Sequence, residues 1–238
     1  MNSLELLEKR KHVQSYDMNR HPPKEIIQKV LWKAWKVTSS KNKMMPYSIF
    51  ILGPDRELAK HLVYERVVQN HADAEYKAAK AGKEDAPDFV EDINEFTKPF
   101  FEKPNKSYFH IKENSYLIVI TSRVVKKTNA FNERQRKRNR RGGKNFFDQM
   151  HESHIDKIKD MASVEVGMFA QNLTTFCMEE EIDISYCSCF QRDIKKWAEL
   201  PFVKYQPRLL VSLGYGDRYR ATRIDDLKPE PEEIIEWI

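Results

Sequence analysis

The sequence predicts a single α+β domain, and three observations support this. The chain has 238 residues, of which 40% are hydrophobic and 32% are charged, a composition typical of globular proteins with a sizeable core. Apolar patterns of helical and of strand type alternate along the chain. No internal repeat and no linker rich in proline, glycine or serine divides it. We therefore expect one domain over residues 1–238.

The first regular elements are expected to be a helix and a buried strand. The segment KEIIQKVLWKAWKV at 24–37 follows two prolines and repeats apolar residues at helical spacing on one face. A polar loop follows at 38–46. YSIFIL at 47–52 then predicts a buried strand that ends at Gly53 and Pro54.

The middle of the chain is expected to be mostly helical. Residues 55–69 and 72–102 have helical patterns, followed by a second strand at 115–122 with the sequence SYLIVITS. The second helical stretch is interrupted by three helix breakers: Gly82, Pro87 and Pro99.

The C-terminal third predicts a long helix and two more strands. The helix covers 147–181 with an apolar stripe, and Gly167 within it costs about 1 kcal/mol against alanine, so we expect close packing or a nearby ligand there. The strands are IDISYCSC at 182–189 and RLLVSLGYG at 208–216, with a short helix at 190–200 between them. A charged tail closes the chain.

Charge is distributed unevenly along the chain. Forty-one basic and 36 acidic residues give a net charge of +5, yet seven of the eleven residues at 134–144 are basic. Such a block has two interpretations, a nucleic-acid footprint or a solvated loop. We prefer the loop, because the block lacks interleaved aromatic residues and no zinc-finger, RRM or KH signature accompanies it.

Several other classes of protein do not fit the sequence. The apolar runs are far shorter than the ~20 residues of a membrane span, and the N-terminus lacks an apolar signal region. Neither a Rossmann fingerprint nor a P-loop occurs. The three cysteines suit a reducing compartment, so we expect a cytoplasmic protein. Cys187 and Cys189 lack the second ligand pair of a zinc site; we expect buried thiols and no metal.

Four segments in order resemble the FMN-dependent nitroreductase family. RKHVQSYD at 10–17 is similar to its N-terminal R-x-S-x-R/K-x-F element, and TSSKNKMMPYSIFIL at 38–52 to its P-S-S-x-N-x-Q-P-W loop and first core strand. The run at 164–190 resembles the A-x-Q-N-L helix, the acidic turn and the strand that follows. PFVKYQPRLLVSLGYGDRYRATR at 201–223 resembles the P-x-x-L-L-x-L-G-Y strand and its trailing basic residues.

The resemblance implies a central, mostly antiparallel sheet flanked by helices, in an intertwined homodimer that binds FMN at its interface. The residues matching the phosphate-binding positions are Arg10, Lys11, His12, Gln14 and, from the far end of the chain, Arg220 or Arg223. Ser39, Ser40 and Asn42 match a loop that reaches the cofactor from the partner chain. Cys187, Ser188 and Cys189 match the segment where a backbone N–H faces flavin N5.

The sequence departs from the family pattern at several of these positions. His12 stands where the family has serine, and Gln14 where it has a cation near the flavin pyrimidine edge. Lys41, Lys43 or Arg123 could replace that charge, which tunes the electronics of the cofactor. Met44 and Met45 replace the loop glutamine, and Cys189 replaces a glycine beside the flavin.

The activity implied by the resemblance is two-step hydride transfer, from NAD(P)H to FMN and then to a flat acceptor such as a nitroaromatic or a quinone. No catalytic side chain is expected, because the flavin carries the chemistry. Residues 126–149 would form a basic lid over the acceptor, and residues 224–238 a tail that embraces the second chain. The substrate and lid residues are Lys41, Phe131, Arg136, Arg138, Phe146 and Phe147. The alternatives are an FMN-binding module without turnover, or a nucleic-acid-binding protein using 134–144.

Overall fold

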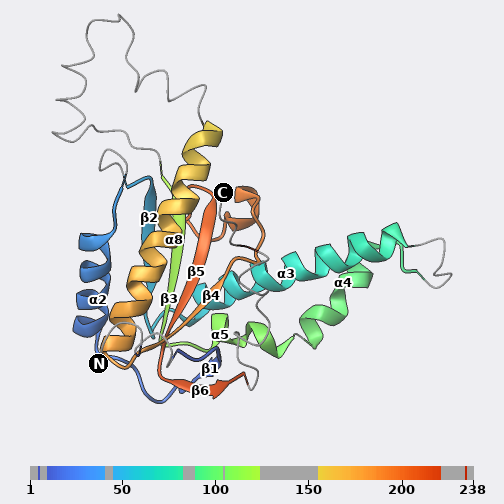
Figure 1. The fold of residues 1–238 in the computed structure, drawn as a ribbon. Helices are drawn as coiled ribbons and strands as arrows, with labels where there is room; N and C mark the ends of the chain where they lie inside the picture. Colours follow the sequence, from blue (N-terminus) through green and yellow to red (C-terminus); the bar gives the residue numbers. More distant parts are fainter. Residues whose placement is uncertain are drawn as a thin grey trace, which may run out of the picture.

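The computed structural model describes residues 5, 10–40, 45–82, 89–103, 105–123, 155–220 and 234, with the backbone alone over 155–161 (Figure 1). The expected lid at 126–149, and with it Phe131, Arg136, Arg138, Phe146 and Phe147, lies outside the described residues. So do Lys41, Asn42, Lys43, Met44, Arg223 and all of the tail except Ile234.

The described elements alternate between strands and helices. In chain order they are β1 (Val13–Tyr16), α2 (Lys24–Val37), β2 (Tyr47–Leu52), α3 (Glu57–Ala81), α4 (Ile93–Glu102), η3 (Lys106–Tyr108), α5 (Phe109–Lys112), β3 (Tyr116–Ser122), α8 (Ile155–Glu179), β4 (Asp183–Cys187), η5 (Ile194–Trp197), β5 (Pro207–Gly214) and β6 (Gly216–Tyr219). None of the described helices combines the length and apolar character that crossing a membrane requires.

A four-stranded antiparallel sheet in the order β2-β3-β5-β4 forms the centre of the fold. Strand β3 is buried on both sides, with Ile118 and Ile120 in one core and Leu117 and Val119 in the other. Helices α2 and α8 cover the first face, while α3, α5 and η5 cover the second. The expected α+β fold with helices on both sides of an antiparallel sheet is therefore confirmed.

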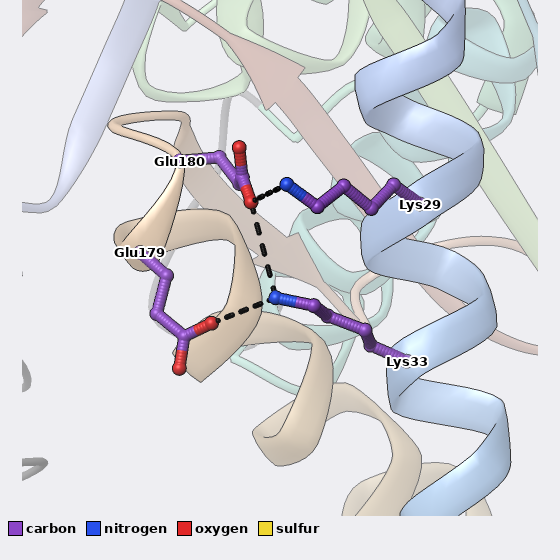
Figure 2. A network of polar contacts seen from close by, with 4 residues as sticks. All are labelled: Lys29, Lys33, Glu179 and Glu180. Atoms are coloured by element: carbon purple, nitrogen blue, oxygen red, sulfur yellow. Dashed lines mark hydrogen bonds and ion pairs between the residues drawn. The ribbon is translucent and has the colours of Figure 1, made fainter.

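Helices α2 and α8 lie side by side and are joined by ion pairs at the C-terminal end of α8 (Figure 2). Lys29 Nζ is 2.6 Å from Glu180 Oε1, and Lys33 Nζ is 3.1 Å from Glu179 Oε2. The hydrogen bond from Lys29 lowers the pKa of the Glu180 carboxyl. Exposed pairs of this kind contribute little stability, so we interpret them as fixing how the two helices align.

A separate two-stranded ribbon, β1 paired with β6, lies at one end of the main sheet. The buried side chain of Tyr16 joins ribbon to sheet, because its hydroxyl donates a hydrogen bond to Ser212 O at 2.8 Å. The Tyr16 ring lies directly against Gly214: a Cβ at this glycine would be 2.8 Å from Tyr16 Cδ1 and 3.0 Å from Ser115 Oγ. Only a residue without a side chain allows this approach.

Buried hydrogen bonds also connect the segments that meet at this end of the sheet. Lys60 is buried and its Nζ donates to the carbonyl oxygens of Asn114 and Ser115 at 2.8 and 2.9 Å, just before β3 begins. Burial lowers the pKa of Lys60 to about 8. The Ser115 hydroxyl also contacts His21 Nδ1 at 3.0 Å. The chain leaving β1 is thus tied to the start of β3 by hydrogen bonds.

Two of the expected helix boundaries were wrong. Residues 57–81 form one continuous helix with no break at 70–71, and Pro99 lies within α4 rather than ending it. Ring contacts support both helices: Tyr76 contacts Phe96 and His71 contacts Phe100, with centroids 5.4 Å apart in each pair. These tertiary contacts offset the cost of the proline in the last turns of α4.

The sequence patterns also missed three short elements, β1, β6 and the turn of helix at α5. Short segments carry little periodic signal, and β1 and β6 exist only as partners of each other. Of the expected helix at 147–181, the described part is 155–179.

Of the two reasons expected for Gly167, close packing or a nearby ligand, the described residues show no close packing. Gly167 lies on an exposed part of α8, and a Cβ there would meet no atom within 4 Å. Exposed Val164 and Met168 lie nearby on the same helix. Packing among the described residues therefore does not explain the glycine at this position.

We predict that Gly214→Ala destabilises the protein by about 1–3 kcal/mol, because the new methyl group overlaps the Tyr16 ring and forces the ribbon away from the sheet. Urea unfolding would measure the change. Gly82→Ala is the matched control, since its nearest atoms, the carbonyl oxygens of Ala78 and Ala79, would be 3.9 Å away. A Gly214→Ala protein as stable as wild type would contradict the proposed packing constraint.

Candidate active site

A cluster of basic side chains forms where the first described segment meets the end of β6. The backbone N–H of Arg220 donates to the carbonyl oxygen of His12 at 2.9 Å, extending the β1–β6 pairing by one step. The segment at Arg10 and Lys11 immediately precedes this pair. The structure thus brings together four of the predicted phosphate-binding residues from opposite ends of the chain: Arg10, Lys11, His12 and Arg220.

Aromatic rings hold two of these cations in place. The Arg10 guanidinium lies over the Tyr186 ring, 5.0 Å from its centroid, and Lys11 Nζ lies 4.7 Å from the centroid of Tyr219. Tyr186 belongs to β4, and α8 holds its side chain in place: its hydroxyl donates to Ala170 O at 2.8 Å and contacts the Thr174 hydroxyl. Cation–π contacts give the long side chains a preferred direction before any ligand binds.

Two histidines belong to the cluster, and neither is readily protonated. Burial lowers the pKa of the half-buried His12, and the positive charges of Arg220 and Arg10 lower it further. His110 on α5 is buried, which lowers its pKa to about 4 although the backbones of Ser107 and Tyr186 favour its charged form. Its Nδ1 donates to Ser107 O at 2.9 Å, so its Nε2 carries the lone pair. No hydrogen-bond partner from the described residues satisfies that buried nitrogen.

The cluster fits a phosphate group. Among the described residues, the charged groups that act on His12 are the two guanidinium groups of Arg220 and Arg10, and no carboxylate of these residues does so. Arg10 and Arg220 are both exposed, so their donors are accessible to a ligand. Guanidinium groups bind phosphate oxygens through paired, charge-assisted hydrogen bonds. An anion here would relieve the repulsion within the cluster.

The end of β4 lies beside the ribbon. Ser185 Oγ donates to Val13 O at 3.0 Å, which ties β4 to β1. Cys187 is buried, and burial raises the pKa of its thiol to about 12, as expected for a structural cysteine. Ser188 and Cys189 follow the strand and are exposed, so the expectation of a buried Cys189 was wrong. The backbone turns outward because β4 ends at Cys187.

The loop between α2 and β2 forms a second group of predicted residues. Ser39 is exposed, and Ser40 Oγ accepts a hydrogen bond from the backbone N–H of Met45 at 2.8 Å. Met45 has a φ of 47°, which is strained for a side chain of this size. Arg123 stabilises it from β3, because its Nε donates to Met45 O at 2.9 Å. Strain maintained by surrounding contacts is frequent at functional sites.

The two groups remain separate in their contacts. In the loop group, Ser40 contacts Met45, and Thr38, two residues before Ser40, accepts a hydrogen bond from Asn172 of α8. The basic cluster is instead built on β1, β6 and β4. Arg123 belongs to the loop group and Gln14 is half-buried on β1. This separation is compatible with the expectation that the loop serves a cofactor bound by the partner chain.

The sequence analysis did not identify Tyr186 or His110 as site residues. Tyr186 stands in a strand where an aromatic residue is ordinary, and His110 lies in a helical turn that the sequence patterns missed. A metal site is not supported either: within the described ranges, no three histidine, cysteine or carboxylate side chains come close enough to hold an ion.

Comparisons with known proteins agree with this geometry. Solved structures with the same fold include a protein from Staphylococcus epidermidis assigned as an NAD(P)H:FMN oxidoreductase (14% identity, TM-score 0.62, covering 100% of this chain and 96% of that chain). A nitroreductase family protein from Streptococcus pneumoniae gives 16% identity and a TM-score of 0.59 over 100% of both chains. A protein from Exiguobacterium sibiricum, assigned as a nitroreductase and solved in complex with FMN, gives 15% identity and a TM-score of 0.57, covering 96% of this chain and 97% of that chain.

The sequence comparisons assign the family. No curated protein matches the chain. The sequence profile described as the Nitroreductase family matches residues 7–215, a range that includes β1, the strands of the central sheet and most of the predicted cofactor-binding residues, and that ends just before β6. With this match and the shared fold, the chain belongs to the Nitroreductase family.

Proposed function

We propose that this protein is an FMN-dependent NAD(P)H oxidoreductase that reduces flat electron acceptors such as nitroaromatics or quinones. The observation that carries the proposal is the basic cluster of Arg10, His12 and Arg220, in which both arginines act on His12, in a chain of the Nitroreductase family. The bound FMN of the Exiguobacterium sibiricum protein, which shares the fold, supports the choice of cofactor.

Each part of the site has a distinct role in this proposal. Arg10 and Arg220, which both act on His12, would hold the FMN phosphate. The exposed backbone after β4, at Ser188 and Cys189, faces the isoalloxazine ring. Bound FMN supplies a ring that accepts a hydride from NAD(P)H and passes it to the acceptor. The side chains of this chain bind and orient, so none is required as an acid, base or nucleophile.

We further propose that the functional unit is a homodimer. Two adjacent helices expose large apolar side chains: on α2, Trp32 and Trp35 are 69% and 50% exposed, and on α8, Val164 is 64% exposed. Exposed apolar residues grouped in this way are typical of protein–protein interfaces. Gly167, which has no neighbour within 4 Å of its Cβ position, leaves room on α8 for close approach by a second chain. The serines of the α2–β2 loop would then reach the cofactor of the partner.

The first prediction concerns cofactor binding. Purified protein should show a flavin absorption spectrum that bleaches on addition of NADH or NADPH. Arg10→Ala and Arg220→Ala should each weaken FMN binding roughly ten- to a hundredfold, because each removes a charge-assisted contact worth about 1.5–3 kcal/mol. Riboflavin, which lacks the phosphate, should bind wild type and both variants equally.

The matched control is Arg56→Ala, which removes an exposed arginine whose side chain lies beside Asp55, before α3. It should leave FMN affinity unchanged. A wild-type protein that neither contains nor binds FMN would overturn the proposed activity. Flavin that is bound but not bleached by either nicotinamide cofactor would select the binding module without turnover.

The second prediction tests where the flavin ring lies. Cys189 is exposed, whereas Cys177 and Cys187 are buried, so only Cys189 should react with a thiol reagent in the native protein. Saturating FMN should slow this reaction at least severalfold, because the bound ring covers the segment after β4. Cys189→Ser should abolish the native-state reaction. Equal reaction rates with and without FMN would place the ring elsewhere.

The third prediction tests the dimer. Light scattering should give wild type a mass near twice 28.3 kDa. Gly167→Arg should shift the mass toward the monomer, because the long side chain occupies the space left for the second chain, while the isolated fold has room for it. Gly82→Arg, which adds the same side chain at another exposed glycine, should remain dimeric. A monomeric wild type with FMN bound would contradict the dimer.

A further inference from the structure

We propose that His12 binds the cofactor phosphate as a proton-linked ligand: it is neutral in the free protein and takes up a proton when the anion binds. FMN affinity would therefore decrease as the pH rises through the neutral range. This inference rests on the proposed function and concerns regulation of the same site by pH.

The position of His12 is fixed by the backbone. Its carbonyl accepts the hydrogen bond from Arg220 N at 2.9 Å, and the next residue, Val13, pairs with Tyr219 in the ribbon. The imidazole is half-buried and close enough to the Arg10 and Arg220 guanidinium groups for both charges to act on it. A phosphate bound by both arginines would consequently lie near His12.

His110 is the second histidine of the cluster, and it is too deeply buried to take up a proton. His12 is therefore the histidine that titrates. Its Nδ1–H is committed to Ser107 O, and its Nε2 is buried without a hydrogen-bond partner among the described residues. Burial, together with the nearby positive charge of Arg220, lowers the pKa of His110 to about 4, so it stays neutral at physiological pH. His12 is only half-buried, whereas His110 is buried. A new negative charge nearby therefore raises the pKa of His12 more readily into the neutral range.

The surroundings of His12 explain why proton uptake accompanies anion binding. Within the part of the chain that the structure describes, the charged and titratable groups on β1 and the elements that contact it include Arg10, Lys11 and Tyr16 on or just before β1, Asp217, Arg218, Tyr219 and Arg220 on or just after β6, Lys106 and Tyr108 on η3, His110 and Lys112 on α5, and Asp183, Tyr186 and Cys187 on β4. Of these, Arg220 and Arg10 act on the charge of His12. Asp183 is engaged with the Gly216 N–H and the Tyr219 hydroxyl, at 2.8 and 3.0 Å. The two arginines disfavour the imidazolium until a phosphate dianion reverses the local potential.

The direction of the pH effect follows from linkage. If the complex holds one more proton than the separated partners, each unit of pH above the pKa of free His12 weakens binding by up to tenfold, until the pKa in the complex is reached. The second ionisation of the FMN phosphate, near pH 6, acts in the opposite direction because the dianion binds the arginines better. The phosphate contribution is common to every variant, so a comparison of variants isolates the histidine.

The test is calorimetric titration of the apoprotein with FMN at pH 6.5–8.5, in two buffers of different ionisation enthalpy, which counts the protons taken up. Wild type should take up a fraction of a proton approaching one near pH 7. His12→Ser, which places the family residue at this position, should lose this uptake while still binding FMN, and its affinity should be nearly constant above pH 7. Riboflavin should bind wild type without proton uptake.

The control variant is His61→Gln, which removes an exposed histidine of α3 that contacts Tyr64 and Glu65; it should take up protons like wild type. Equal uptake by wild type and His12→Ser, with FMN bound by both, would overturn the proton-linked role of His12 and leave the proposed function intact. Failure of wild type to bind FMN in any buffer would instead overturn the proposed function.

Discussion

The contact between Tyr16 and Gly214 is the constraint on which the candidate site depends. Tyr16 is the last residue of β1, and Gly214 is the last residue of β5. A side chain at 214 would overlap the tyrosine ring and Ser115 together. Because Gly214 leaves that space open, the ribbon can rest on the end of the central sheet, with the Tyr16 hydroxyl bonded to Ser212 O. Residues close to either end of the chain then meet at one place.

This arrangement concentrates positive charge in one place. The resulting electrostatic repulsion is only partly offset by contacts within the chain. The rings of Tyr186 and Tyr219 stabilise Arg10 and Lys11, and burial keeps both histidines neutral. The guanidinium groups of Arg10 and Arg220 still act together on His12, and no carboxylate from the described parts of the chain balances them there. A site that is electrostatically unfavourable when empty gains more from an anion than a neutral site does. This charge balance is the physical basis of the proposed phosphate site.

The sequence predicted the core of the fold because long periodic segments bury whole faces. The helix at 24–37 and the strand at 47–52 were predicted with the bounds that the structure has, and α8 has the expected apolar stripe. The helix breaks were mispredicted because aromatic contacts between α3 and α4 override local propensity. Strands β1 and β6 were missed because each forms only in the presence of the other.

For the candidate site, the sequence indicated which side chains could bind a cofactor, but not how buried each one is or what it contacts. The resemblance identified Arg10, His12 and either Arg220 or Arg223, with Arg223 the better match; the structure brings Arg220 to His12, and Arg223 lies outside the described residues. His110 could not be found this way, because its role depends on burial and on a nitrogen without a partner, which only coordinates reveal. The same holds for Cys189, whose exposure depends on where β4 ends, and for Met45, whose backbone strain depends on Ser40 and Arg123.

The two departures on β1 can be considered together. Relative to the family pattern, His12 adds a titratable group at the proposed phosphate end, and Gln14 removes a fixed charge from the proposed ring end. Arg123 lies at the α2–β2 loop, bonded to Met45, so any charge it gives to the ring comes from a different element and, in the proposed dimer, from the other chain. Cofactor retention would then depend on groups within one chain, while the electronics of the flavin would depend on assembly. Loss of the dimer would on this basis alter the reduction potential of the flavin before it released the phosphate.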